Sequence, residues 1–224
     1  WLKPDSEYEN AVTDFFDKIL DFSNNNVFLK EFIPFQKKIA FYGMFNSLSQ
    51  TLLKITAPGI PDIYQGAELW DLNLVDPDNR RPVDFGKRRK YLKQIKKGNT
   101  LSLIEKYFKK PENGCIKLLM IHQALQVRNQ YPDVFEKGSY VPIEIEGGLR
   151  DHVLAFARNY QGLWTVVVVP RFLSSVIEEK ILPIGRAIWE NTQLILPAKV
   201  NCWKNGITDQ VVHDLYVGDR KSVV

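Results

Sequence analysis

The sequence is poor in the residues from which metal sites and disulfide frameworks are built. Its 224 residues include two cysteines and three histidines. Cys115 and Cys202 lie far apart, and His122, His152 and His213 each stand alone without further ligands at short spacing. Disulfide-rich folds and zinc sites need such residues in pairs or clusters. We therefore expect no metal, no cofactor and a reducing, cytoplasmic location.

Long apolar runs are also missing. A membrane helix needs about 20 consecutive apolar residues, whereas Val166 to Val169 is a run of strand length. The chain starts Trp1-Leu2-Lys3-Pro4, with neither an initiator methionine nor a basic-then-apolar leader. That start fits an internal fragment as well as a mature protein. With 45% hydrophobic and 25% charged residues, the composition is that of a globular protein, and no membrane partner is expected.

Positive charge is concentrated in one segment. The stretch from Lys87 to Lys97, KRRKYLKQIKK, carries seven of the thirty basic residues. It could be a nucleic-acid or membrane patch, or a helix whose Tyr91, Leu92 and Ile95 face inward while the lysines are solvated. One helix face is a small footprint for a nucleic-acid binder. We favour the solvated helix and expect no nucleic-acid partner.

Apolar residues recur at helical spacing in the first part of the chain. After an N-cap at Asp5 or Ser6, one helix is predicted up to a break at residues 23–26. A second helical region is predicted from about residue 27 to 56, with a new start at Pro34. Further helices are predicted at residues 86–97, 100–109 and 112–130.

The pattern changes near residues 131–138, where short alternating runs broken by glycine, proline and asparagine begin. Such runs are typical of antiparallel strands, and residues 159–162, Asn-Tyr-Gln-Gly, indicate a hairpin turn. Strands are predicted at residues 140–146, 152–160, 163–170, 188–196 and 211–217. The expected fold class is α+β, with a mostly helical part over residues 1–135 and an antiparallel β-sandwich over residues 136–224.

The segment from Ala57 to Phe85 is polar in a way that suits sugar recognition. An extended stretch is expected at residues 60–64, followed by a sharp exit at Gly66. Carboxylates, amides and guanidinium groups bond hydroxyl pairs, and aromatic faces pack on pyranose rings. Alternatively, the acidic and basic residues pair with each other, or two carboxylates form a glycosidase pair. The polar and aromatic residues are Asp62, Tyr64, Gln65, Glu68, Trp70, Asp71, Asn73, Asp76, Asp78, Asn79, Arg80, Arg81 and Asp84.

Here the sequence resembles a known family. The string TAPGIPDIYQGAELWDLNLVDPDNRRPVDF resembles the segment at and after the eighth barrel strand in maltooligosyl trehalose synthases, which belong to the α-amylase superfamily (glycoside hydrolase family thirteen). The likeness continues through IHQALQVRNQYPDVFEKGSY, LAFARNYQGLWTVVVVPR and LPIGRAIWENTQLILP, and weakens beyond about Ile207. The resemblance therefore implies that residues 1–135 are the C-terminal part of a (β/α)8 barrel, including its last strand and loop.

The resemblance also implies an activity. Family members are (1→4)-α-D-glucan 1-α-D-glucosylmutases, isomerases that convert the reducing-end α-1,4 linkage of a maltooligosaccharide into an α,α-1,1 linkage. Their catalytic carboxylates follow barrel strands four, five and seven, and this sequence resembles only what comes later. The resemblance thus implies a C-terminal portion with no catalytic residue. Its substrate-binding candidates, around the reducing end, are Tyr64, Gln65, Asp76, Asn79, Arg80 and Arg81.

Four further expectations stay open at this point. Asp76 and Arg81 could form an ion pair that braces the loop, and Trp70 could belong to the core. A rival function is a non-catalytic α-glucan-binding module that uses Trp164, Trp189 and Trp203, which could equally be core residues. A barrel fragment should also expose apolar surface, around Phe41, Phe45 and Leu52 for example, through which it could associate.

Overall fold

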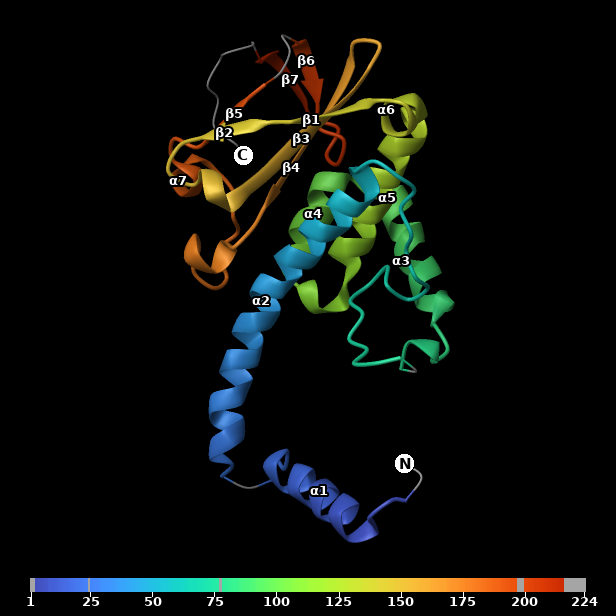
Figure 1. Ribbon diagram of the computed structural model, residues 1–224, viewed down its shortest axis with the longest axis vertical. Helices are drawn as coiled ribbons and strands as arrows, with labels where there is room; N and C mark the ends of the chain where they lie inside the picture. Colours follow the sequence, from blue (N-terminus) through green and yellow to red (C-terminus); the bar gives the residue numbers. More distant parts are fainter. Residues whose placement is uncertain (1–2, 24, 77, 197–199, 216–224) are drawn as a thin grey trace. The chain divides into compact units, whose positions relative to one another are not determined.

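The computed structural model describes residues 3–23, 25–76, 78–196 and 200–215 (Figure 1). Internal contacts divide the chain into two compact units, Trp1–Met44 and Phe45–Val224. The first unit is helical, and the second contains helices and small antiparallel sheets. The α+β class is confirmed, whereas the boundary expected between residues 135 and 136 stays a prediction.

The first unit contains helix α1 (Ser6–Ile19) and the beginning of helix α2 (Val27–Thr56). The predicted cap of α1 is confirmed, since the Asp5 carboxylate accepts a hydrogen bond from the backbone N–H of Tyr8 at 3.1 Å. The predicted new start at Pro34 is wrong, because α2 continues through this residue. Proline removes one donor from a helix, but the residues on both sides keep helical geometry.

The prediction that apolar surface is exposed around Phe45 is wrong. This side chain is buried, with 5% of its surface exposed, and its ring lies 6.2 Å from that of Phe108. Phe41 and Leu52 are half-buried. The exposed apolar residues of α2 lie nearer its start and are Val27, Phe28, Phe32, Phe35 and Ile39.

The helical part of the second unit is built on one apolar cluster. Helices α3 (Phe85–Lys97), α4 (Thr100–Phe108) and α5 (Cys115–Gln130) lie together, and α6 (Pro132–Glu136) follows (Figure 1). The inward face predicted for the basic segment is confirmed, since Ile95 is buried and Tyr91 and Leu92 are half-buried. The buried cluster consists of Leu69, Ile95, Leu103, Tyr107, Cys115, Ile116, Leu118 and Leu119.

The strands form three small antiparallel sheets. One has the order β1-β3-β4, and the others pair β2 with β5 and β6 with β7. The predicted hairpin is confirmed: Tyr160 pairs with Leu163, and the two residues between them, Gln161 and Gly162, have φ angles of 50° and 82°. Two positive φ angles define the turn that matches strand twist. The strands are β1 (Ser139–Pro142), β2 (Glu144–Glu146), β3 (Val153–Tyr160), β4 (Leu163–Pro170), β5 (Gln193–Ile195), β6 (Val200–Lys204) and β7 (Val211–Leu215).

One predicted strand is much shorter in the structure. The run at residues 188–196 begins inside helix α7 (Arg186–Trp189), and only Gln193–Ile195 is a strand. Residues 60–64, expected as an extended stretch, lie in no described strand, and the last barrel strand implied by the resemblance stays a prediction. The end of the predicted strand at residues 211–217 lies outside the described residues. Short 3-10 turns occupy Asp78–Arg80, Pro111–Asn113, Arg150–His152 and Leu173–Ser175.

One buried guanidinium connects helices and sheet. Arg158 on β3 is only 2% exposed and donates hydrogen bonds to the carbonyl oxygens of Gly138 at 2.7 Å and Phe135 at 3.0 Å. It also donates to those of Ser139 at 3.3 Å and Thr56 at 3.4 Å. The end of α2, the end of α6 and the start of β1 thus share one donor. Burial, helped by the nearby charge of Arg128, lowers the pKa of Arg158.

We predict that Arg158→Met lowers the free energy of unfolding by about 3 kcal/mol or more, because it leaves buried carbonyl groups without the charged donor. Urea unfolding followed by circular dichroism measures the change. Arg150→Met removes an exposed arginine of the same sheet region and serves as the control, expected to change stability by less than about 0.5 kcal/mol. Equal effects of the two substitutions would contradict the role assigned to Arg158.

Candidate functional site

The candidate site is the polar loop that joins α2 to α3, residues 57–84. Apart from the short turn Asp78–Arg80 it has no regular secondary structure. It ends at Asp84, the N-cap of α3, whose carboxylate accepts from the backbone N–H of Lys87 at 2.8 Å. The loop therefore runs between two helix ends, as Figure 1 shows. Its shape depends on how those ends hold it.

Arg128 of α5 fixes the start of this loop. Its guanidinium donates to the carbonyl oxygen of Ile55 at 2.8 Å and to that of Gly59 at 2.6 Å. The last carbonyl groups of a helix lack partners within the helix and carry partial negative charge. A cation at this place therefore stabilises the end of α2 and sets the direction of the chain beyond it.

Arg88 of α3 closes the base of the loop. Its Nε donates to Oε2 of Glu68 at 2.8 Å, and its Nη atoms donate to the carbonyl oxygens of Gly66 at 2.5 Å and Asp84 at 3.2 Å. Glu68 also accepts from the backbone N–H of Gly66 at 3.0 Å. The two charged side chains are 17% and 26% exposed, so solvent screens them only partly. One guanidinium thus joins both ends of residues 66–84.

Leu69 and Trp70 anchor the loop to the helical core. Leu69 is buried, and the indole N–H of Trp70 donates to the carbonyl oxygen of Pro111 at 2.6 Å. Gly114 has a φ of 73°, and a Cβ there would lie 2.9 Å from the backbone nitrogen of Trp70. This close approach requires glycine. Trp70 is therefore a structural residue, as one reading of the sequence allowed.

A cation also lies beside this anchor. The Lys117 ammonium is 5.9 Å from the centre of the Trp70 ring. Burial lowers the pKa of Lys117, and Lys54 lowers it further, whereas Asp71 and Glu68 oppose the shift. In the core below, burial raises the pKa of the Cys115 thiol and of the Tyr107 hydroxyl. Cys115 and Tyr107 share one buried cluster with Leu69, and Trp70 packs against that cluster at the base of the loop.

The outer turn of the loop is closed by two ion pairs. Arg80 donates to both carboxylate oxygens of Asp76, from Nε to Oδ1 at 3.1 Å and from Nη2 to Oδ2 at 2.7 Å. Arg81 binds Asp78 at 2.8 Å. The ion pair that the sequence left open between Asp76 and Arg81 is not the one that forms, because the 3-10 turn places Arg80 beside Asp76. Exposed pairs of this kind are worth at most about 1 kcal/mol, so a ligand can exchange for them.

Of the remaining candidates, Asn79 lies within this turn, whereas Tyr64 and Gln65 are not joined to it. Tyr64 and Gln65 are exposed and precede the clamp at Gly66, and no hydrogen bond or ion pair of the described residues links them to Asp76–Arg81. Asn79 has a buried Oδ1 atom without a hydrogen-bond partner among the described residues. The turn between Leu72 and Val75 exposes apolar side chains, with Leu72 92% exposed. The structure therefore shows a fixed base and an open, mixed polar and apolar outer turn.

This arrangement can bind but holds few free acid–base groups. Glu68, Asp76 and Asp78 each accept a hydrogen bond from an arginine and are therefore already paired. Within the described parts of the chain, no group of three or more histidine, cysteine or carboxylate side chains is placed to hold a metal ion. Sequence reasoning missed Arg88 and Arg128 as clamps, because nothing in a basic run or a helix end indicates which distant carbonyl a guanidinium reaches.

Comparison with known proteins gives one consistent result. A protein of Mycobacterium tuberculosis (strain CDC 1551 / Oshkosh), assigned as a maltooligosyl trehalose synthase, is 32% identical over 194 residues, which are 84% of this chain and 22% of that protein. The same values hold for its counterpart in strain ATCC 25618 / H37Rv. No model of a protein family matches the chain. The similarity therefore rests on alignments with individual sequences and structures.

Solved structures agree with the sequence matches. A crystal structure of a maltooligosyl trehalose synthase superposes with a TM-score of 0.69 and 29% identity, and a mutant of the Arthrobacter ramosus enzyme with 0.70 and 26%. Both cover 95% of this chain and 25% of the solved chain. All of these relatives are of one class, enzymes named for a maltooligosaccharide and for trehalose. The chain belongs to the maltooligosyl trehalose synthase family and spans about a quarter of the length of its relatives.

We predict that removing the Glu68–Arg88 clamp loosens the loop without unfolding the core. In Arg88→Gln, amide hydrogen exchange over residues 66–84 should accelerate by about tenfold or more, because charge-assisted hydrogen bonds are worth about 1.5 kcal/mol or more each. Exchange within α5 should stay unchanged. Mass spectrometry of peptic fragments measures both.

The neighbouring exposed residue offers a matched control. Arg89→Gln removes the same charge from the same helix, yet Arg89 has no ion-pair partner among the described residues. It should leave exchange of the loop unchanged. Glu68→Gln should accelerate exchange as Arg88→Gln does, and the double variant should add little to either. Additive effects of the two substitutions would show that the pair does not close the loop.

Proposed function

We propose that this chain forms the C-terminal portion of a maltooligosyl trehalose synthase and supplies one wall of its sugar-binding site. The complete enzyme would convert the reducing-end α-1,4 linkage of a maltooligosaccharide into an α,α-1,1 linkage by intramolecular transglucosylation. The observation that carries the proposal is the loop at residues 57–84. Its base is fixed by buried contacts and its outer turn exposes guanidinium and carboxylate groups.

The proposed wall acts by orienting a sugar rather than by reacting with it. The planar groups of Asp76, Arg80 and Arg81 suit pairs of sugar hydroxyls, since guanidinium and carboxylate groups form two parallel hydrogen bonds. The Tyr64 ring, 48% exposed, offers an apolar face. Together with Gln65 and Asn79 these residues form the proposed subsites around the reducing end. In the barrel arrangement implied by the family, they would lie at the end of the eighth strand.

The chemistry itself is assigned to carboxylates outside this chain. A retaining double displacement needs a nucleophile, an acid/base and a residue that stabilises the oxocarbenium-like transition state. The loop carboxylates of this chain are instead held by arginines or exposed at the outer turn. We therefore assign no catalytic residue here. The proposal includes residues 1–135 as the end of the barrel and residues 136–224 as a β-sandwich.

The glucan-binding module is the weaker alternative. Trp189 is 3% exposed and donates to the carbonyl oxygen of Pro183 at 3.0 Å. Trp164 packs against the cluster around Ile143, Ala155 and Ala157. Half-buried Trp203 keeps its indole nitrogen buried. These tryptophans lie in the protein interior or at its margin and do not form an open stacking platform, so the alternative is not favoured.

We predict that the isolated chain forms no maltooligosyl trehalose from maltopentaose, because the groups that break and form the glycosidic bond are assigned elsewhere. Chromatography of the reaction products after prolonged incubation measures this. Formation of the non-reducing product by the pure chain would overturn the assignment. The Arthrobacter ramosus relative, assayed in parallel, shows that the conditions support the reaction.

We further predict that a chimera regains activity when this chain replaces the matching quarter of the Arthrobacter ramosus enzyme. In that chimera Arg80→Gln should raise KM for maltopentaose by about tenfold, since a lost charged hydrogen bond to substrate costs about 1.5 kcal/mol or more. Arg150→Gln, on an exposed turn away from the loop, should leave KM unchanged. An active chimera whose KM does not respond to Arg80→Gln would contradict the proposed subsite.

A further inference from the structure

The most strongly charged surface of the chain lies outside the proposed sugar site. Between Asp84 and Glu105 the sequence contains no carboxylate residue, yet it carries Lys87, Arg88, Arg89, Lys90, Lys93, Lys96 and Lys97. Arg88 is used by the loop clamp. The other cations have no ion-pair partner among the described residues. The surface therefore presents positive charge that the chain itself leaves uncompensated.

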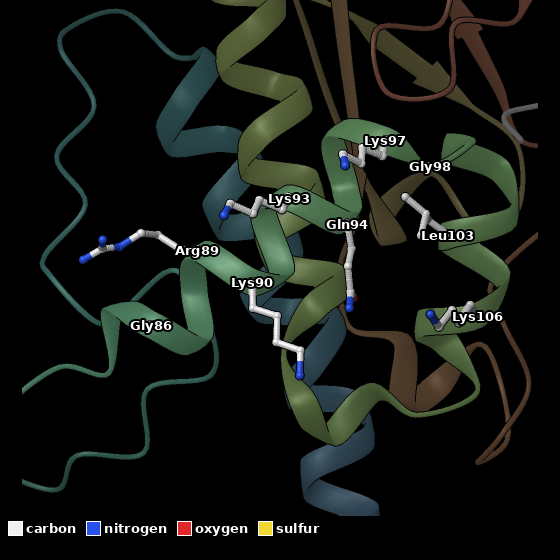
Figure 2. A pocket seen from close by; sticks show the side chains of 9 residues that line it. All are labelled: Gly86, Arg89, Lys90, Lys93, Gln94, Lys97, Gly98, Leu103 and Lys106. Atoms are coloured by element: carbon white, nitrogen blue, oxygen red, sulfur yellow. The ribbon is translucent and has the colours of Figure 1, made fainter.

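Four of these cations, together with Lys106, line one concavity between α3 and α4. Figure 2 shows Arg89, Lys90, Lys93 and Lys97 projecting from α3, with Arg89 and Lys93 pointing away from Lys106 on the adjacent α4. The concavity has a volume of about 640 Å³, and its lining residues are Gly86, Arg89, Lys90, Lys93, Gln94, Lys97, Gly98, Leu103 and Lys106. Every charged group in that lining is positive. We define these nine residues as the basic concavity.

The joint between the two helices keeps this concavity in shape. A Cβ added at Gly98 would lie 2.7 Å from Cδ1 of Leu103, so the chain turns tightly between α3 and α4. The Asn99 side chain caps α4 by accepting from the backbone N–H of Ser102 at 3.1 Å. Leu103 is buried beneath the cations and is part of the helical core. The cations thus stand on a rigid support.

The spacing of the cations destabilises helix α3 as long as no anion is bound. Arg89, Lys93 and Lys97 follow each other at four-residue intervals on one helical face, where like charges repel. A ligand that brings several negative charges together would relieve this repulsion at every position. A single carboxylate would not. Lysine ammonium groups bind phosphate oxygens as point charges and need no fixed orientation.

We propose that the basic concavity binds a small anion with two or more adjacent phosphate groups. The lining lacks an aromatic ring on which a base or sugar could stack, so the phosphate chain is what the site recognises. Five cations favour a polyanion over an uncharged maltooligosaccharide, which brings no charge that offsets their mutual repulsion. The proposal is therefore independent of the glucan function, and either can fail without the other.

Calorimetric titration of the pure chain with sodium tripolyphosphate at low ionic strength tests this proposal. We expect saturable binding of one anion per chain, weakened strongly at an ionic strength of about 0.15 M because salt screens exposed charges. In the double variant Lys93→Gln with Lys97→Gln the dissociation constant should rise by about tenfold or more. Adenosine triphosphate in place of tripolyphosphate shows whether a free phosphate chain or a nucleotide binds more tightly.

Two matched variants separate the site from general charge effects. Lys37→Gln with Lys38→Gln removes the same charge from exposed positions on α2 and should change the dissociation constant by less than about twofold. Lys93→Arg with Lys97→Arg keeps the charge and should retain binding. Circular dichroism confirms that each variant is folded.

Three outcomes would overturn the proposal. They are the absence of saturable tripolyphosphate binding by the unmodified chain, an equal loss in the α2 control, and binding of a homouridine oligonucleotide that tripolyphosphate fails to displace. The last outcome would assign the surface to a nucleic acid instead.

Discussion

The arrangement of the second unit depends on two arginines that satisfy the carbonyl groups at the end of α2. Arg158 reaches Thr56 from the sheet, and Arg128 reaches Ile55 and Gly59 from α5. A helix end buried without partners for its carbonyl groups is costly. Because these donors come from elements far away in sequence, the same hydrogen bonds that complete α2 also fix where the sheet and α5 lie. The helical end of α2 and the packing of the sheet and α5 around it therefore depend on the same hydrogen bonds.

The loop inherits its rigidity from this constraint. With the end of α2 fixed and Asp84 capping α3, the chain between them must span a set distance, and Arg88 divides it into a closed base and a free outer turn. Burial stabilises only the base of the loop, through Leu69 and Trp70. The outer turn relies on exposed ion pairs, which contribute little to stability. That division suits a binding surface, since a ligand can replace the ion pairs while the support stays in place.

Sequence patterns predicted the helices well because helical periodicity and capping are local. The cap at Asp5, the inward face with Ile95 and the turn at Gln161-Gly162 each follow from residues within a few positions of one another. Pro34 misled because a proline can be accommodated in a long helix when its neighbours continue the pattern. Residues 60–64 lie in no described strand, because extended chain becomes a strand only when a partner strand lies beside it.

The site was predictable in its composition but not in its pairing. A run of acidic, basic and amide residues between prolines indicates a polar loop, yet one residue of register decides whether Asp76 meets Arg80 or Arg81. The role of Arg88 was hidden for a different reason. It belongs to a basic run whose other members face solvent, and only the fold separates the one cation turned toward Glu68 from its neighbours. Helix α3 therefore fixes the loop through Arg88 on one face and presents uncompensated positive charge on another. The charge pattern of the sequence alone does not distinguish these two faces.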